Sequence, residues 1–307
     1  MAPIKTWSTP VRDEESLPIP CVICGSRQFR PRLSCEGFSY AACGGCGLVQ
    51  INPQPLNQRV MRRYREDHGE AYLSYELANE AAFLRLQELA LADAGFYEWE
   101  RGLNKEPPPR ALDVGCATGS LLGLLRERGW QVRGVEISTP QAEYARLKRG
   151  LDVRGLPLEE NNFTENEFTL VLASHVIEHL NDPAAFVREG YRILSPGGLF
   201  LVTTPNIAGF QARLFKSRWR SAIFDHLYLF SVKTLSQLLL RAGFGIERVL
   251  TWGGLAAGTA PAPLKRWADR GAKKFGWGDV MLIRAVKKGS DHSCPPPLAR
   301  RFELRCF

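Results

Sequence analysis

The chain lacks any long apolar segment. None of its 307 residues belongs to an apolar run near the ~18 to 20 residues that a membrane-spanning helix needs. The first ten residues, Met1 to Pro10, contain no apolar core of the kind found in a secretory leader. We therefore expect a cytoplasmic protein with no membrane partner.

The composition limits the chain to a few classes. Hydrophobic residues make up 45% of it, which supports a sizeable α/β domain with a small accessory unit. Eight cysteines in a cytoplasmic protein favour metal ligands or thiols over disulfides. The net charge is +8, but Lys and Arg are spread along the chain. We expect a solvated basic face rather than a nucleic-acid partner, although a phosphorylated ligand would also fit.

The most informative stretch runs from Ala111 to Leu122. It reads as a buried strand, a tight turn through Gly115 and Gly119, and the first turn of a helix. Such a turn at a helix N-terminus can receive a nucleotide-like cofactor. Glu136 ends the next strand, where a carboxylate can accept hydrogen bonds from both ribose hydroxyls. The third glycine of the dinucleotide fingerprint is missing, which argues against a NAD-dependent oxidoreductase, an alternative that we keep.

The segment Asp113-Val-Gly-Cys-Ala-Thr-Gly119, with Glu136, resembles the cofactor site of class I S-adenosylmethionine-dependent methyltransferases. The resemblance implies a Rossmann-like α/β fold with a seven-stranded, doubly wound sheet. The acid that usually reads adenine after the third strand is absent here, so Leu156 or Glu159 would take its place. The cofactor residues implied by the resemblance are Asp113, Gly115, Cys116, Ala117, Gly119, Glu136, Ile137, Leu156 and Ser174.

The segment that follows the fourth predicted strand, His175-Val-Ile-Glu-His179, is similar to the ubiquinone-biosynthesis-like branch of this family. The resemblance implies O- or C-methylation of a small-molecule acceptor, such as a sugar or a natural-product intermediate. A catalytic base would be His175, His226 or Tyr228, whereas the alternative is that these histidines only fix loops by hydrogen bonds. His175, Glu178 and His179 are also candidates for a divalent-metal site.

Two further segments are expected to shape the acceptor pocket. Residues 207–224 form an insertion after the fifth strand, and such insertions commonly cover the acceptor in this family. Tyr64, Tyr72 and Tyr75 precede the first strand and line the pocket or, equally well, pack at a domain seam.

Two cysteine pairs near the N-terminus predict a metal site. Cys21 and Cys24 form one C-x-x-C knuckle, Cys43 and Cys46 form the other, and 18 residues separate the two. This spacing is typical of a zinc ribbon, whose four thiolates leave no open position, so the zinc would be structural. An iron–sulfur site is the alternative.

The zinc ribbon joined to this methyltransferase type resembles nucleotide-sugar C-methyltransferases. A zinc-ribbon nucleic-acid-binding protein with an inactive methyltransferase fold is the non-enzyme alternative. We predict a flexible lead at 1–17, a zinc ribbon at 18–55, a helical cap or linker at 56–106, the methyltransferase domain at 107–288 and a disordered tail at 289–307. The ribbon and the methyltransferase domain are expected to have separate cores, and the oligomeric state is open.

Overall fold

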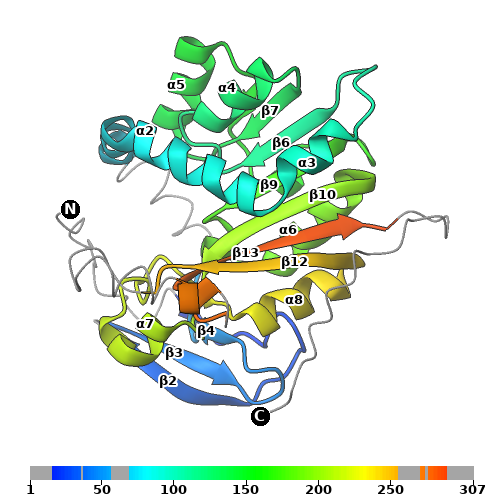
Figure 1. The fold of residues 1–307 in the computed structure, drawn as a ribbon. Helices are drawn as coiled ribbons and strands as arrows, with labels where there is room; N and C mark the ends of the chain where they lie inside the picture. Colours follow the sequence, from blue (N-terminus) through cyan, green and yellow to red (C-terminus); the bar gives the residue numbers. More distant parts are fainter. Residues whose placement is uncertain (1–15, 36, 57–68, 255–269, 274–275, 289–307) are drawn as a thin grey trace.

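The computed structural model describes residues 16–35, 37–56, 69–254, 270–273 and 276–288. Figure 1 shows a large twisted sheet with helices packed against it, and a small sheet formed mainly by the N-terminal part of the chain. Residues 1–15 of the predicted lead, the whole predicted tail and Tyr64 lie outside the described residues. The last two residues of the predicted flexible lead, Ser16 and Leu17, instead form a short paired strand. Among the described residues, no helix combines the length and the apolarity that crossing a bilayer requires.

The large sheet has the strand order β12-β13-β10-β9-β6-β7-β8. All neighbours are parallel except β13, which is antiparallel to both β10 and β12. The predicted seven-stranded, doubly wound α/β fold is therefore confirmed. Its strands are β6 (Arg110–Val114), β7 (Gln131–Val135), β8 (Val153–Arg154), β9 (Phe168–Ser174), β10 (Leu194–Pro205), β12 (Phe244–Trp252) and β13 (Val280–Lys287).

Alternation along the strands divides the core into two layers. On β9, Leu170 and Leu172 join one buried cluster, whereas Val171 and Ala173 join the other. Successive side chains of a strand point to opposite faces, so a sheet covered on both faces needs apolar residues at nearly every position.

The helices of the described residues include α2 (Gly69–Asp93), α3 (Phe96–Arg101), α4 (Ser120–Glu127), α5 (Thr139–Arg149), α6 (Pro183–Ile193), α7 (Phe210–Phe215) and α8 (Val232–Arg241), with short 3-10 turns η3 (Leu158–Glu160), η4 (Ile177–His179) and η5 (Lys216–Arg218).

The small sheet is not a separate unit. Its order is β11-β4-β3-β2, and β11 (Tyr228–Leu229) comes from the far end of the large domain. The other strands are β2 (Phe29–Cys35), β3 (Phe38–Cys43) and β4 (Val49–Ile51), while β1 (Ser16–Leu17) pairs with β5 (Gln54–Pro55).

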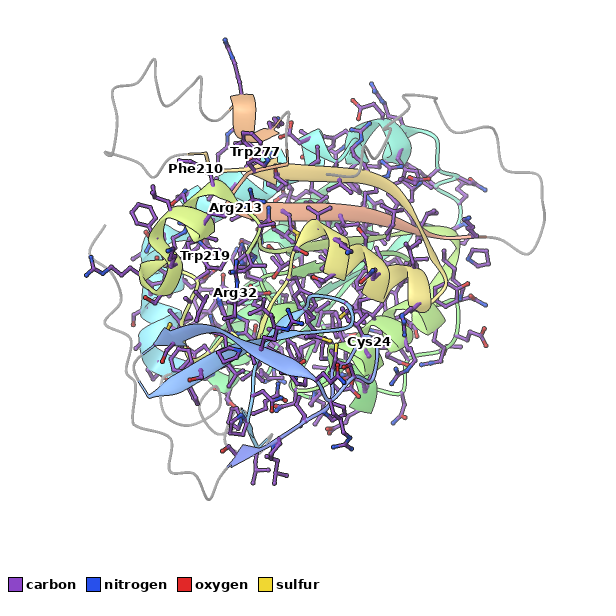
Figure 2. The ribbon with its side chains drawn as sticks, turned by 90° about the horizontal axis from the view of Figure 1, so that it is seen from below. Cys24, Arg32, Phe210, Arg213, Trp219 and Trp277 are labelled. Atoms are coloured by element: carbon purple, nitrogen blue, oxygen red, sulfur yellow. The ribbon has the colours of Figure 1, made fainter. Side chains whose placement is uncertain are left out.

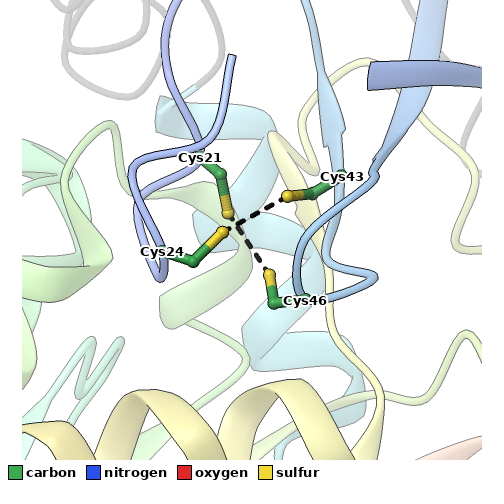
Figure 3. Close-up of side chains that lie close together, drawn as sticks. All are labelled: Cys21, Cys24, Cys43 and Cys46. Carbon is green, nitrogen blue, oxygen red and sulfur yellow. Dashed lines mark hydrogen bonds between the residues drawn. The ribbon is translucent and has the colours of Figure 1, made fainter. Parts of the chain in front are cut away.

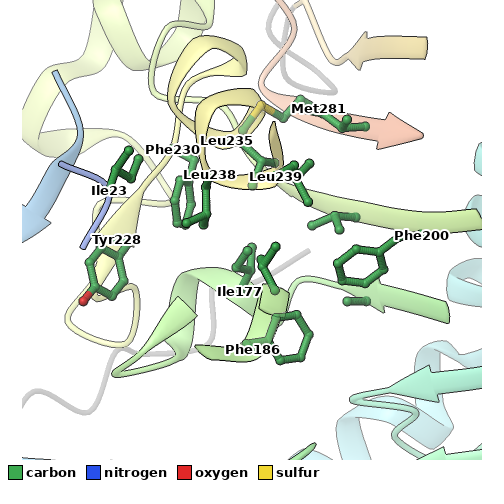
Figure 4. Close-up of a cluster of buried hydrophobic side chains, with 14 of the residues drawn as sticks. Ile23, Ile177, Phe186, Phe200, Tyr228, Phe230, Leu235, Leu238, Leu239 and Met281 are labelled. Carbon is green, nitrogen blue, oxygen red and sulfur yellow. The ribbon is translucent and has the colours of Figure 1, made fainter. Parts of the chain in front are cut away.

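Side chains of the small sheet also join the core of the large domain. Ile23 and Tyr40 belong to the same buried cluster as Phe186 and Leu238. Figure 4 draws Ile23 together with other side chains of this cluster. The expectation of separate cores is therefore wrong, because a strand and a hydrophobic cluster are shared.

The insertion at 207–224 does not cover the cavity described below. The Tyr40 hydroxyl, which has one hydrogen to donate, lies 2.7 Å from the carbonyl oxygens of both Ile223 and His226. The Cys35 Sγ lies 3.6 Å from the Ser217 carbonyl oxygen, so the insertion packs against β2 and β3 instead. Figure 2 shows its helix α7, with Phe210 and Arg213, beside Trp277.

Two helices differ from what their residue types favour. Ser138 occupies the N-cap position of α5, but its hydroxyl makes no capping hydrogen bond. Leucines recur along α2, but the helix does not bury a broad apolar face: Leu86 is 62% exposed and Leu89 is 47% exposed.

Candidate active site

A cavity of about 400 Å³ lies at the carboxyl ends of β6, β7 and β9. The strand order reverses between β6 and β9, and ligands of open α/β sheets bind at such a switch point. Its lining residues are Tyr72, Val114, Gly115, Val135, Glu136, Ile137, Gln141, Pro157, Leu158, Glu159, Glu160, Ser174, His175, Val176, His179, Leu180, Asn181, Asp182, Ala185 and Phe186.

The turn after β6 needs its two glycines. Gly115 has φ +73° and Gly119 has φ +79°, a region in which other residues are strained. A Cβ atom on Gly115 would lie 2.5 Å from the Val176 Cγ2, and one on Gly119 would lie 2.4 Å from the Leu151 Cδ1. The backbone at Gly115 therefore forms part of the cavity wall without a side chain to fill it.

Glu136 ties the glycine turn to the next helix. Its Oε2 accepts a 3.0 Å hydrogen bond from the Ala117 N–H, and its Oε1 accepts a 2.8 Å hydrogen bond from the Ser138 N–H. The residue is only 8% exposed, and burial raises its pKa. Each carboxylate oxygen has a second lone pair, so the side chain can still accept hydrogen bonds from a ligand in the cavity.

His175 lies on the turn after β9. Its Nδ1 is 3.1 Å from the Glu178 Oε1, and the Thr204 hydroxyl donates a 2.9 Å hydrogen bond to the Glu178 Oε2. Burial alone would raise the pKa of Glu178, but the hydrogen bond and charge of His175, with the imidazoles of His179 and His226, lower it to about 2. Glu178 is therefore an ionised partner that orients the His175 ring.

The other two base candidates do not line the cavity. His226 is buried, its Nδ1 lies 2.8 Å from the Ser221 carbonyl oxygen, and burial beside His179 lowers its pKa to about 3. Tyr228 is fully buried, and its hydroxyl donates a 3.0 Å hydrogen bond to the Asn181 carbonyl oxygen. Burial raises the pKa of Tyr228. The geometry therefore favours His175 among the three.

The four N-terminal cysteines converge, as Figure 3 shows. The Sγ atoms of Cys21 and Cys46 are 3.4 Å apart, those of Cys24 and Cys43 are 3.4 Å apart, and all four lie within 4.8 Å of one another. The Gly45 N–H donates a 3.3 Å hydrogen bond to the Cys43 Sγ. Four sulfurs at such distances fit the tetrahedral shell of a structural zinc.

A family profile described as "Methyltransferase domain" matches residues 85–249, which is more than half of the chain. This chain belongs to that methyltransferase family.

Its curated relatives include a "Probable S-adenosylmethionine-dependent methyltransferase" from Mycolicibacterium smegmatis. The two are 32% identical over 142 residues, which cover 45% of this chain and 53% of the relative. A ubiquinone biosynthesis O-methyltransferase from Bradyrhizobium sp. is 36% identical over 124 residues, which cover 38% of this chain and 49% of the relative. This methyltransferase chain thus spans about half the length of the curated relatives that it matches.

A solved structure of a SAM-dependent methyltransferase from Thermotoga maritima has the same fold. The TM-score is 0.54 with 23% identity, and the alignment covers 75% of this chain and 99% of the other.

The cavity of this methyltransferase fits S-adenosylmethionine, the cosubstrate of the family. Its volume lies in the range of small-molecule sites, roughly 300 to 1,000 Å³. Gly115 leaves room for a close approach to the backbone, and the Glu136 carboxylate lines the cavity with acceptor oxygens.

The predicted cofactor residues of the methyltransferase fall into two groups. Four line the cavity: Gly115, Glu136, Ile137 and Ser174. Five do not: Asp113, Cys116, Ala117, Gly119 and Leu156. Asp113 lies behind the wall, where burial and the charge of Glu136 raise its pKa to about 8.

The lining residues that the sequence did not predict include Leu158 and Gln141. Leu158 lines the cavity, whereas Leu156 does not and is 44% exposed. Pro157 lies between them as the N-cap of the short helix η3, whose first residue is Leu158. Gln141 lies in the first turn of α5, and the Thr139-Pro140 helix start was a usable signal for it. Two of the three candidate tyrosines are among the described residues. Tyr72 lines the cavity, whereas the ring of Tyr75 packs against the ring of Phe83, with 5.8 Å between the ring centroids.

Proposed function

We propose that the chain transfers the methyl group of S-adenosylmethionine to a small-molecule acceptor. The observation that carries this proposal is the cavity at the switch point, where Gly115 and Glu136 stand at the ends of two adjacent strands. In the reaction, a bond forms between an acceptor atom and the methyl carbon as the sulfur–methyl bond breaks. The sulfonium becomes a thioether, and an acceptor O–H or C–H proton must leave.

The cofactor roles follow the order of the strands. The backbone at Gly115 would lie against the methionine part of the cofactor, and Glu136 would accept the ribose hydroxyls. Leu158 and Glu159 would face the adenine, because they follow β8 and line the same cavity. Alignment of the two reactants supplies most of the rate enhancement in such a displacement.

His175 is the proposed general base. Its Nδ1 faces the Glu178 carboxylate, so the neutral ring carries its lone pair on Nε2. Its side chain is 48% exposed and lines the cavity, where an acceptor can reach it. A base at this position would take the proton of a hydroxyl, or of a carbon next to a carbonyl group.

The remaining parts of the proposal concern organisation and acceptor. Residues 18–55 with a zinc ion on Cys21, Cys24, Cys43 and Cys46 would form the ribbon, 56–106 the cap and 107–288 the catalytic domain. The acceptor would be a sugar or a natural-product intermediate, methylated on oxygen or carbon. A cytoplasmic location stays a prediction.

Calorimetric titration with S-adenosylmethionine and S-adenosylhomocysteine tests the cofactor assignment. A panel of sugars and phenols, read by mass spectrometry for a gain of one methyl group, then tests the reaction. Binding of NADH in place of both sulfur nucleosides would refute the proposal.

A further inference from the structure

Three ligand-type side chains meet beside the cavity. Glu178 and His179 come from η4, His226 comes from the segment before β11, and their ligand atoms lie within 4.8 Å of one another. We propose that Glu178, His179 and His226 bind one divalent transition-metal ion, in addition to the ion of the four cysteines.

The two imidazoles are held as metal ligands usually are. The His179 Nδ1 lies 2.8 Å from the Asp225 carbonyl oxygen, and the His226 Nδ1 lies 2.8 Å from the Ser221 carbonyl oxygen. A carbonyl oxygen only accepts, so each Nδ1 carries the hydrogen and each Nε2 carries a lone pair. A backbone carbonyl on the second ring nitrogen is the common support of a metal-bound histidine.

The carboxylate is fixed in the same way. Glu178 is 1% exposed, and its two oxygens contact the Thr204 hydroxyl and the His175 ring. Among the described residues, no Lys or Arg forms an ion pair with it. A buried carboxylate is costly unless a cation or hydrogen bonds compensate it. Thr204 and His175 compensate Glu178 in part, and a divalent ion between a Glu178 oxygen and the two imidazoles would add further positive charge.

The donor set indicates the class of ion. Two imidazole nitrogens and one carboxylate oxygen suit Zn²⁺, Fe²⁺, Co²⁺ and Mn²⁺, and three protein ligands leave coordination positions open. The sequence suggested His175, Glu178 and His179 as the metal ligands. In the structure the Nδ1 of His175 lies against Glu178, so His175 orients the carboxylate and His226 takes its place as the third ligand.

The position suggests a role that rests on the proposed function. His179 lines the cavity, so an acceptor oxygen there could complete the coordination shell of the ion. Metal binding itself does not depend on that role, and the experiment therefore counts ions.

Native mass spectrometry of the full chain, loaded with zinc, counts the ions on each variant. Wild type should carry two zinc ions, Cys43→Ser should keep only the histidine-bound ion, and Glu178→Gln and His226→Gln should each keep only the cysteine-bound ion. His175→Gln, which changes a supporting residue, should keep both ions and weaken the second by no more than about 100-fold. Calorimetry with S-adenosylmethionine on the same samples tests the proposed function separately.

X-ray absorption at the zinc edge of wild type does not depend on variants that fold. Mixed sulfur and nitrogen or oxygen coordination should appear with two ions bound. A single ion with sulfur ligands alone would overturn the proposal, as would a second ion that His175→Gln removes and His226→Gln retains.

Discussion

Glu136→Gln is the sharpest test of the cofactor site. In the structure both carboxylate oxygens accept backbone N–H groups, from Ala117 at 3.0 Å and from Ser138 at 2.8 Å. A glutamine has only one oxygen, so its NH₂ group must face one of these N–H groups. The remaining oxygen can accept a hydrogen bond from only one ribose hydroxyl. Loss of one charge-assisted hydrogen bond costs about 1.5 to 3 kcal/mol, and each 1.36 kcal/mol is a factor of ten, so the affinity for S-adenosylmethionine should fall about 10- to 150-fold.

Glu136→Gln should change the free energy of unfolding less than it changes the free energy of S-adenosylmethionine binding. The substitution removes one backbone contact, but it also removes a buried charge, and these two changes oppose each other. Calorimetry with S-adenosylmethionine measures the affinity, and urea denaturation measures the free energy of unfolding. Glu143→Gln makes the same chemical change at an exposed position of α5 outside the cavity lining. An affinity of Glu136→Gln equal to that of Glu143→Gln would refute the assignment of the ribose to Glu136.

Further changes test other parts of the chain. Cys43→Ser should lower the melting temperature of the whole protein, because the small sheet shares the main core; an unchanged main transition in calorimetry would contradict this. His175→Gln should lower turnover about 100-fold or more with little change in cofactor affinity, and a near-normal rate would exclude it as the base. Asp113 has a pKa of about 8 in the folded state against 3.8 as a free side chain. Its contribution to the free energy of unfolding is therefore complete below pH 3.8 and is lost as the pH rises towards 8. Asp113→Asn should reduce this loss of stability, which urea denaturation at pH 6 and at pH 8.5 measures. Gly115→Ala should lower both the stability of the fold and the cofactor affinity, because Gly115 has a φ of +73°. The backbone cost is roughly 1 to 2 kcal/mol. In contrast, a Cβ on Gly123 meets open space within α4, so Gly123→Ala should stabilise the chain by about 0.5 to 1 kcal/mol.

The large sheet was predictable because its strands carry strong local signals. Apolar runs bounded by Gly, Pro and charged residues coincide with β6, β9 and β13, and Asp182 caps α6 through the Ala184 and Ala185 N–H groups. The segment 195–198 has the Pro-Gly-Gly composition of a turn, but it lies inside β10, where the register with β9 shifts between Leu194 and Leu199. Local turn chemistry does not reveal that a strand continues through such an irregularity.

The site was predictable mainly where strand ends carried its residues. Gly115, Glu136 and Ser174 each follow a strand, and all three line the cavity. His226 and Tyr228 were candidate bases and were therefore expected at the cavity. Instead they lie beside the small sheet, because β11 pairs with β4. That pairing joins residues about 180 positions apart in the chain and has no signal in either segment alone.

The same pairing explains how the ribbon contributes to the site. Asn181 lines the cavity, and its Nδ2 donates hydrogen bonds to the Gln54 Oε1 at 3.3 Å and to the Pro55 carbonyl oxygen at 3.0 Å. On the other side, the Asn181 carbonyl oxygen accepts the Tyr228 hydroxyl, and Tyr228 pairs with Gln50 of β4. The wall of the cavity is therefore held from both sides by the segment that follows the four cysteines. A structural metal in the ribbon would stabilise this wall, since the strands that hold it emerge from the second cysteine knuckle.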